Sequence, residues 1–305
     1  MTDFFELFCA VNTANSAPSG STSQLQTTFV PGSNQSRMRI YSQGGQFNLK
    51  GYSVSMRNAY LKYCFPSLLV RSSLSYIWID SNTYTLSLPA NSTWTAAQLN
   101  VALQQVQIAN KNYLINAQNV PVFYISVAQN STVYSVEVDL TQLPSTLPVG
   151  WTMPPGATWA LGSTDTPQFI VPDVNIGGVI GFPVGTYPAI ATVPSVGTVI
   201  SYWSLMFNMC PQVTPYNCIF VNSSVVNNTA NSINGVNCIY TMPINSAYGQ
   251  PLVSDVYNPQ PIKCSQLQTQ YIDVFLTDGN GVPLVVLDPF WQVILHFQKD
   301  MDTKI

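Results

Sequence analysis

The residues of this chain that could do chemistry are few and widely spaced. Its only histidine, His296, lies near the C-terminus in FWQVILHF, downstream of Asp278 and Asp288. Nucleophilic catalysis needs a base beside the nucleophile, and His296 is the only imidazole available. Apolar residues occupy every second position from Trp291 to Phe297, and His296 lies in the opposite register. This alternation is typical of a β-strand and favours a structural histidine over a catalytic one.

The carboxylates offer no clear catalytic or metal-binding set. The sequence DGNG at 278–281 superficially resembles a calcium loop, but the further acids and the bidentate glutamate of such a loop do not follow. Asp-Gly and Asn-Gly reach positive φ in tight turns, so we predict a turn here. Glu137 and Asp139 share one face of a predicted strand, where a solvated face is favoured over a cation site because no third acid is near. No pair of acids stands out for glycoside hydrolysis.

The cysteines and the glycine-rich segments do not indicate a cofactor either. Six cysteines are spread over the chain without a C-x-x-C pair, which favours buried free thiols over disulfides or zinc. A nucleophile elbow, a phosphate-binding loop of the Walker type and a dinucleotide fingerprint are all absent from the sequence. We therefore predict a protein that is not an enzyme and has no cofactor and no metal site.

The composition predicts a folded protein with an unusual surface. Charged residues make up 8% of the 305 residues, against about 25% in typical proteins, while 46% are hydrophobic. The polar surface must therefore consist of Asn, Gln, Ser, Thr and Tyr, which we interpret as a surface that meets partners. The N-terminus lacks the features of a signal peptide, and no apolar run approaches the length of a membrane span, so we expect a soluble protein made in the cytosol.

The basic residues are unevenly placed along the chain. The formal net charge of −3 argues against a globally basic nucleic-acid binder. Six Lys or Arg residues nevertheless lie between Glu6 and Asp80 with no acid among them, and such asymmetry can orient a molecule toward an acidic partner. The alternative, charges solvated singly on several strands, stays open. The arginines that we predict to take part in such contacts are Arg37, Arg39, Arg57 and Arg71.

The order of the predicted elements indicates an all-β fold with an insertion. Residues 1–36 read as an N-terminal arm because they are small and polar from 12 onward. Short alternating runs at 37–81 and 193–305 predict one β-sandwich or barrel domain that is split by an insertion at 82–192. The insertion contains the one convincing helix, which begins at a capping box of Thr95 and Gln98 and ends near Asn110. Two strands joined by a turn at 129–131 follow it.

Several of these motifs together resemble one family. The segment FLTDGNGVPLVVLDPFWQVILHF is similar to the last strand pair of the penton (minor capsid) proteins of virophages and polinton-like viruses, in which a Thr-Asp-x-x-Gly-x-Pro-Leu turn precedes a Leu-Asp and a final apolar strand. The strand and helix in TYTLSLPANSTWTAAQLNVALQQVQIANKNYLI, the hairpin VFYISVAQNSTVYSVEVDL and the block GGVIGFPVGTYP occur in the order that this family has. The resemblance covers about residues 74–298 and brings no catalytic residue with it.

The resemblance implies a fold, an assembly and partners. It implies a single jelly-roll β-sandwich with an inserted domain, which forms a homopentamer at each fivefold vertex of an icosahedral capsid and contacts the double-jelly-roll major capsid protein. The protein would then reside in the virion after assembly in the host cytoplasm, and the four arginines would face acidic partners or the packaged genome. The alternative is a host-attachment or carbohydrate-binding jelly roll that recognises a host receptor. A hydrolase is the least favoured reading, since no residue set supports it.

Overall fold

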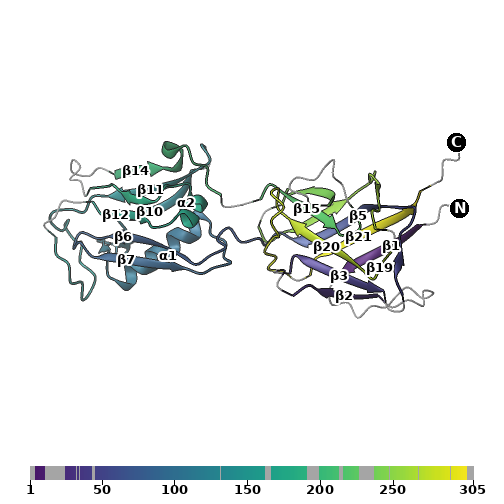
Figure 1. The fold of residues 1–305 in the computed structure, drawn as a ribbon. Coiled ribbons are helices and arrows are strands. Elements are labelled where there is room, and N and C mark those ends of the chain that lie inside the picture. Colours follow the sequence, from purple (N-terminus) through teal and green to yellow (C-terminus); the bar gives the residue numbers. More distant parts are fainter. Residues whose placement is uncertain are drawn as a thin grey trace. The chain divides into compact units, whose positions relative to one another are not determined.

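The chain forms two compact units. The computed structural model describes residues 4–10, 25–31, 33, 35–42, 45–130, 132–161, 166–190, 199–212, 216–226, 237–246, 248–266, 268–288 and 290–300. One unit, here called the sandwich unit, comprises Met1–Phe65 and Tyr216–Ile305, and the other, the inserted unit, comprises Pro66–Pro215 (Figure 1). The rings of Phe65 and Tyr216 pack edge to face with centroids 5.8 Å apart, so the chain leaves and re-enters the sandwich unit at neighbouring points.

The sandwich unit contains two antiparallel sheets. The first sheet has the order β1 (Phe4–Ala10), β21 (Gln292–Lys299), β5 (Tyr52–Lys62) and β17 (Pro251–Asp255), and β18 (Ile262–Lys263) also pairs with β5. The second sheet has the order β16 (Cys238–Pro243), β15 (Cys218–Ser223), β20 (Tyr271–Thr277), β3 (Arg37–Ser42) and β2 (Leu25–Phe29). A short ladder joins β4 (Phe47–Asn48) to β19 (Gln268–Thr269).

The strand order is that of a jelly roll. Numbered along the chain, the eight main strands are β1, β3, β5, β15, β16, β17, β20 and β21. The first sheet then reads 1-8-3-6 and the second 5-4-7-2, with β2 added at the edge beside the second strand. Two sheets that exchange consecutive strands in this way form the double Greek key of a jelly roll. The predicted all-β, jelly-roll fold is therefore confirmed, and the inserted unit lies between the third and fourth strands.

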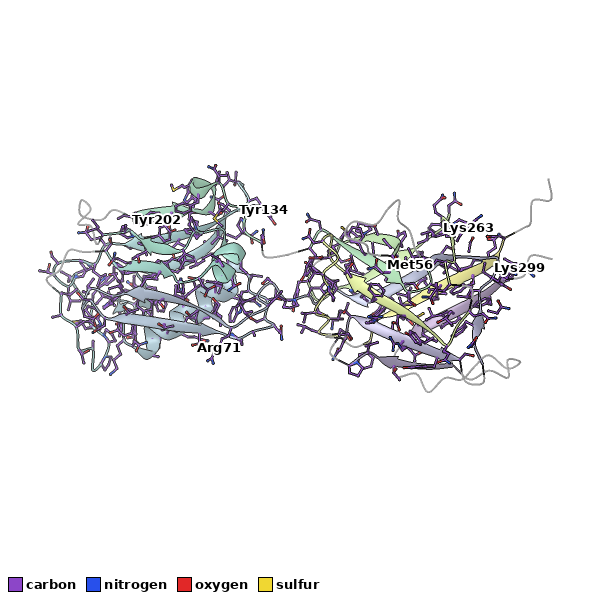
Figure 2. The ribbon with its side chains drawn as sticks, viewed as in Figure 1. Met56, Arg71, Tyr134, Tyr202, Lys263 and Lys299 are labelled. Atoms are coloured by element: carbon purple, nitrogen blue, oxygen red, sulfur yellow. The ribbon has the colours of Figure 1, made fainter. Side chains whose placement is uncertain are left out.

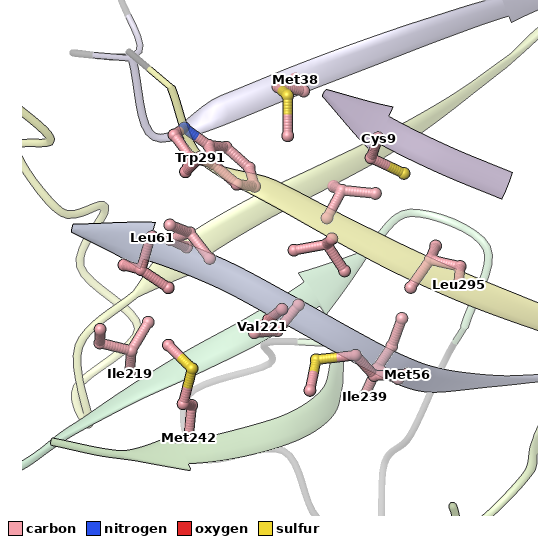
Figure 3. Packing of buried hydrophobic residues seen from close by; sticks show 14 of the residues in the cluster. Cys9, Met38, Met56, Leu61, Ile219, Val221, Ile239, Met242, Trp291 and Leu295 are labelled. Atoms are coloured by element: carbon pink, nitrogen blue, oxygen red, sulfur yellow. The ribbon is translucent and has the colours of Figure 1, made fainter. Parts of the chain in front are cut away.

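The core of the sandwich unit is made by alternate residues of the two sheets. On β21 and in the segment before it, Trp291, Val293, Leu295 and Phe297 are each at most 1% exposed, as the alternation predicts. They pack with inward-facing residues from other strands, among them Cys9, Met38, Met56, Leu61, Ile219 and Val221 (Figure 3). Burying each large apolar side chain contributes about 1.5–3 kcal/mol, so the packing of these side chains holds the two sheets together.

The inserted unit is built from two further sheets, with helices. One sheet has the order β13 (Gly185–Tyr187), β12 (Gln168–Val171), β6 (Ser72–Ile77) and β7 (Thr83–Leu88). The other has the order β10 (Ile125–Asn130), β11 (Ser135–Thr141) and β14 (Val199–Trp203), and a short ladder joins β8 (Leu114–Ile115) to β9 (Pro121–Val122). The helices are α1 (Ala96–Ala109), α2 (Val174–Ile180) and the 3-10 helix η1 (Ser204–Phe207).

Helix α1 begins where the sequence places it. The Thr95 hydroxyl accepts from the Gln98 N–H at 3.2 Å, and the Gln98 side chain accepts from the Thr95 N–H at 2.9 Å, which completes the capping box. The buried face of the helix includes Leu99 and Leu103, and the helix contacts β10 and β7. The hairpin predicted after it is present as β10 and β11.

The boundaries of the two units differ from those that the sequence predicted, because the inserted unit comprises Pro66–Pro215. Within the predicted arm at 1–36, β1 pairs along its whole length with β21, and β2 pairs with β3, so both belong to the sandwich. The remainder of the arm from 11 to 24 lies outside the described residues. The predicted limits of the insertion, 82 and 192, fall short because β6 pairs with β7 and β12, and β14 pairs with β11. Alternation reveals a strand but not its sheet, which depends on distant partners.

Candidate functional site

Arg37 and Arg39 lie on the outer face of the second sheet and share one buried carboxylate. Strands β3 and β20 place Arg39 directly opposite Asp273. Arg39 donates from Nε to Oδ1 at 2.6 Å and from Nη2 to Oδ2 at 2.9 Å, and Arg37 donates from Nε to Oδ2 at 3.1 Å. The Arg39 guanidinium also lies over the ring of Tyr271, 3.9 Å from its centroid. The Arg37 guanidinium lies over the ring of Phe275, 5.4 Å from its centroid. The arginines therefore cover Asp273, whose side chain is 1% exposed.

The electrostatics of this cluster are those of a structural ion pair. Burial by itself raises the pKa of the Asp273 carboxyl, but the hydrogen bonds from Arg39 and Arg37 outweigh it and hold that pKa below its ordinary value. The same hydrogen bond raises the pKa of Arg39. Both arginines therefore have an intramolecular partner, which the sequence could not show because 234 or more residues separate them from it.

Arg57 lies on the outer face of the first sheet, at a β-bulge. The register between β5 and β21 shifts between Ile294 and Leu295, which leaves Arg57 without an opposite residue. The bulge puts Arg57 and Asn58 on the same outer face, whereas inward residues precede and follow them. The sequence contains a signal for this bulge, because two residues instead of one separate the inward-facing Met56 and Ala59. A search for strict alternation does not detect such a shift.

Around Arg57 the polar residues of four strands meet. Arg57 forms an ion pair with Glu6 of β1, and the Nδ1 atom of His296 lies 3.7 Å from the same carboxylate oxygen. The His296 ring packs against Phe4 with centroids 5.4 Å apart. On the other side, Asn58 donates to the carboxylate of Asp255. His296 thus lies on the outer face, as its register predicts, and the residue opposite it on β5 is Ser55. The Nδ1 atom of His296 has no hydrogen-bond partner among the described residues, so the two residues form no nucleophile–base hydrogen bond through that atom.

Arg71 belongs to the inserted unit, unlike the other three predicted arginines. It is exposed (Figure 2), and among the described residues it makes no ion pair. The four arginines therefore fall into three separate environments, and their contact with acidic partners or a genome stays a prediction.

The other candidate residues have structural partners. Glu137 accepts from the Trp203 indole N–H at 2.6 Å, and Asp139 accepts from the Ser201 hydroxyl at 2.5 Å. Asp278 caps the predicted turn, because its side chain accepts the backbone N–H groups of residues 280 and 282 at 2.9 and 2.8 Å. Strands β20 and β21 on either side of this turn lie in different sheets, so they are not the strand pair that the sequence suggested.

The thiols and carboxylates of the described residues do not gather into metal sites. All six cysteines are free, with Cys9 and Cys64 buried, Cys210 exposed and the others partly buried, so the predicted burial holds for only two of them. Within the described part of the chain, no group of three or more His, Cys, Asp or Glu could hold a metal ion. Among the same residues, no helix has both the length and the apolar character to cross a membrane.

The strand order defines the class: an eight-stranded jelly roll with a mixed α and β unit inserted between its third and fourth strands. No protein-family model and no curated protein sequence matches the chain. Among solved structures, the chain is similar to the mavirus penton protein, with 11% sequence identity over 90% of this chain and 97% of that chain, and a TM-score of 0.39. The assignment of the fold rests on the strand order itself.

Proposed function

We propose that this protein is a structural component of a viral capsid, the penton subunit, which acts by assembly and catalyses no reaction. The observation that carries the proposal is the jelly-roll strand order, with a second unit inserted between the third and fourth strands. Jelly rolls are a recurrent fold of viral capsid proteins. The sequence motifs that resemble penton proteins point the same way.

The surface supports a role in assembly. With 8% charged residues, the chain has little of the charge that keeps monomers apart, and uncharged residues suit the core of an interface. Among the strands that the structure describes, β1 is an edge strand that pairs only with β21, and it exposes Phe4 and Phe8 at 63% and 58%. Open edges with exposed apolar side chains are natural sites of pairing with another chain.

The proposed assembly is a closed ring of five copies at the fivefold vertex of an icosahedral virion. Such a ring needs head-to-tail interfaces, in which one face of a subunit meets a different face of the next. The proposed neighbours are double-jelly-roll major capsid proteins, and assembly would take place in the host cytoplasm. Contact of the exposed Arg71 with an acidic partner or the genome belongs to this proposal.

Light scattering and electron microscopy test this function. The purified protein, alone or co-expressed with a major capsid protein of the same virus, should give five-membered rings or enter capsid-like particles. Phe8→Glu should weaken this assembly, because it places a charge on the open edge of β1. Val149→Glu, which changes a residue that is 99% exposed in the inserted unit, is the matched control. A protein that stays monomeric and never enters particles would refute the proposal.

A further inference from the structure

The outer face of the first sheet carries a depression of about 820 Å³ that the assembly proposal does not use. Its lining crosses four of the five strands, with Glu6 from β1, His296 from β21, Arg57 and Asn58 from β5, and Asp255 from β17. The segment that follows β17 lines it as well, and includes Tyr257. All of these residues belong to the sandwich unit, and the volume is in the range of about 300–1,000 Å³ that is typical of ligand sites.

The bulge in β5 supplies the polar groups of this depression. A regular strand would point only one of two consecutive residues outward, but here Arg57 and Asn58 both line the site. Bulges occur often beside functional sites, where they redirect a side chain. The bulged strand therefore brings a guanidinium and an amide side by side on an otherwise ordinary sheet face.

These polar side chains are held in place before any ligand arrives. Arg57 is paired with Glu6, and Asn58 donates to Asp255. The Arg57 side chain is nevertheless 60% exposed and lines the depression, and its contact with Glu6 is made through Nη1, which leaves its other N–H groups available to a ligand. Groups that are already ordered lose little conformational entropy on binding, which favours affinity.

The mixture of groups excludes several ligand classes. A phosphate or a nucleic acid would meet the carboxylates of Glu6 and Asp255 as well as Arg57, and like charges repel. A metal ion would need three suitable ligands, which do not gather among the described residues. A purely apolar ligand would bury the N–H groups and carboxylate oxygens that these pairs leave free, and would offer them no hydrogen bond.

A neutral ligand rich in hydroxyl groups suits the carboxylates, the guanidinium and the amide of this depression. Each hydroxyl can donate to a carboxylate oxygen and accept from a guanidinium or amide N–H. Tyr257, which is 97% exposed, offers a ring face on which the C–H groups of a sugar can pack. We propose that this depression binds a neutral oligosaccharide, with Tyr257 as the stacking platform and with Arg57, Asn58 and Asp255 as the hydrogen-bonding groups.

An array of neutral and sialylated oligosaccharides, probed with the full-length protein, tests the proposal. Neutral glycans should be retained, and Tyr257→Ala should weaken their binding by about tenfold or more, because it removes the stacking ring. Phe290→Ala, which removes an aromatic ring that is 64% exposed in the same unit but does not line the depression, should leave binding unchanged. Tyr257 and Phe290 are both exposed, so both variants should unfold at the same temperature as the wild type.

Three results would overturn the oligosaccharide site. One is that no neutral glycan is retained, and another is that Tyr257→Ala and Phe290→Ala bind as the wild type does. The third is that Tyr257→Ala changes the oligomeric mass in light scattering while no glycan binds, which would make this face a contact between copies of the chain. Assembly and glycan binding are measured separately, so either proposal can fail without the other.

Discussion

Replacing Asp273 by asparagine should destabilise the sandwich unit by about 2–3 kcal/mol. Asp273 is 1% exposed and accepts hydrogen bonds from both Arg37 and Arg39. Breaking a buried ion pair costs about 3–5 kcal/mol when the remaining charge is left buried. The Arg37 and Arg39 side chains are 40% and 25% exposed, so water can solvate them in part. The expected loss of stability is therefore smaller than for a fully buried pair.

The same residue predicts how stability depends on pH. The two arginines hold the pKa of folded Asp273 below its ordinary value, so the carboxylate stabilises the fold wherever it is ionised. This contribution should be fully present above the unfolded pKa of about 3.9, and should be lost as the pH falls from there through the lower folded value. Asp273→Asn should therefore reduce the loss of stability on acidification.

Differential scanning calorimetry of the full-length protein measures both effects. For a unit of roughly 155 residues, the expected loss corresponds to a transition lowered by about 5–10 °C. The inserted unit does not contain Asp273 and provides an internal reference. Asp255→Asn removes an exposed carboxylate of the same unit, and should cost less than about 0.5 kcal/mol. If both substitutions have equally small effects, the reasoning about the buried pair is wrong.

Three further predictions follow from the backbone, the thiols and the domain order. Gly181→Ala should destabilise the inserted unit by about 2 kcal/mol or more in calorimetry, because φ is +77° and the new Cβ would lie 2.7 Å from a side-chain carbon, whereas Gly178→Ala meets nothing within 4 Å and should be tolerated. With a disulfide reagent at pH 8, exposed Cys210 should react at once, and Cys9, whose pKa is raised by burial, only on unfolding; equal rates would contradict this. Replacing residues 66–215 by a short glycine linker should leave a sandwich unit with a cooperative unfolding transition, and a molten product would count against its independence.

The sequence predicted features that are encoded locally. The alternation from Trp291 to Phe297 identified the inward face of β21, and the pair Thr95 and Gln98 identified the start of α1, since both depend on neighbouring residues. Helix α2 was missed because its seven residues include two glycines, which weaken any helical signal. The sheet to which β1, β6 or β14 belongs depends on partners far away in the sequence, and alternation contains no information about them.

Three arginines of the basic segment between Glu6 and Asp80 pair with acids once the chain is folded. Between Glu6 and Asp80 the sequence shows only basic charges, but Glu6 of β1 pairs with Arg57, and Asp273 of β20 pairs with Arg37 and Arg39. The acids that pair with three of the arginines in this region therefore come from its boundary, at Glu6, and from far outside it, at Asp273. Neutralising all four arginines together would leave Asp273 buried without a partner, so a loss of assembly could then reflect unfolding. Arg71→Gln avoids this difficulty, because Arg71 is exposed and makes no ion pair among the described residues. If particle assembly and packaging are unchanged in Arg71→Gln, the electrostatic contact predicted for this residue does not exist.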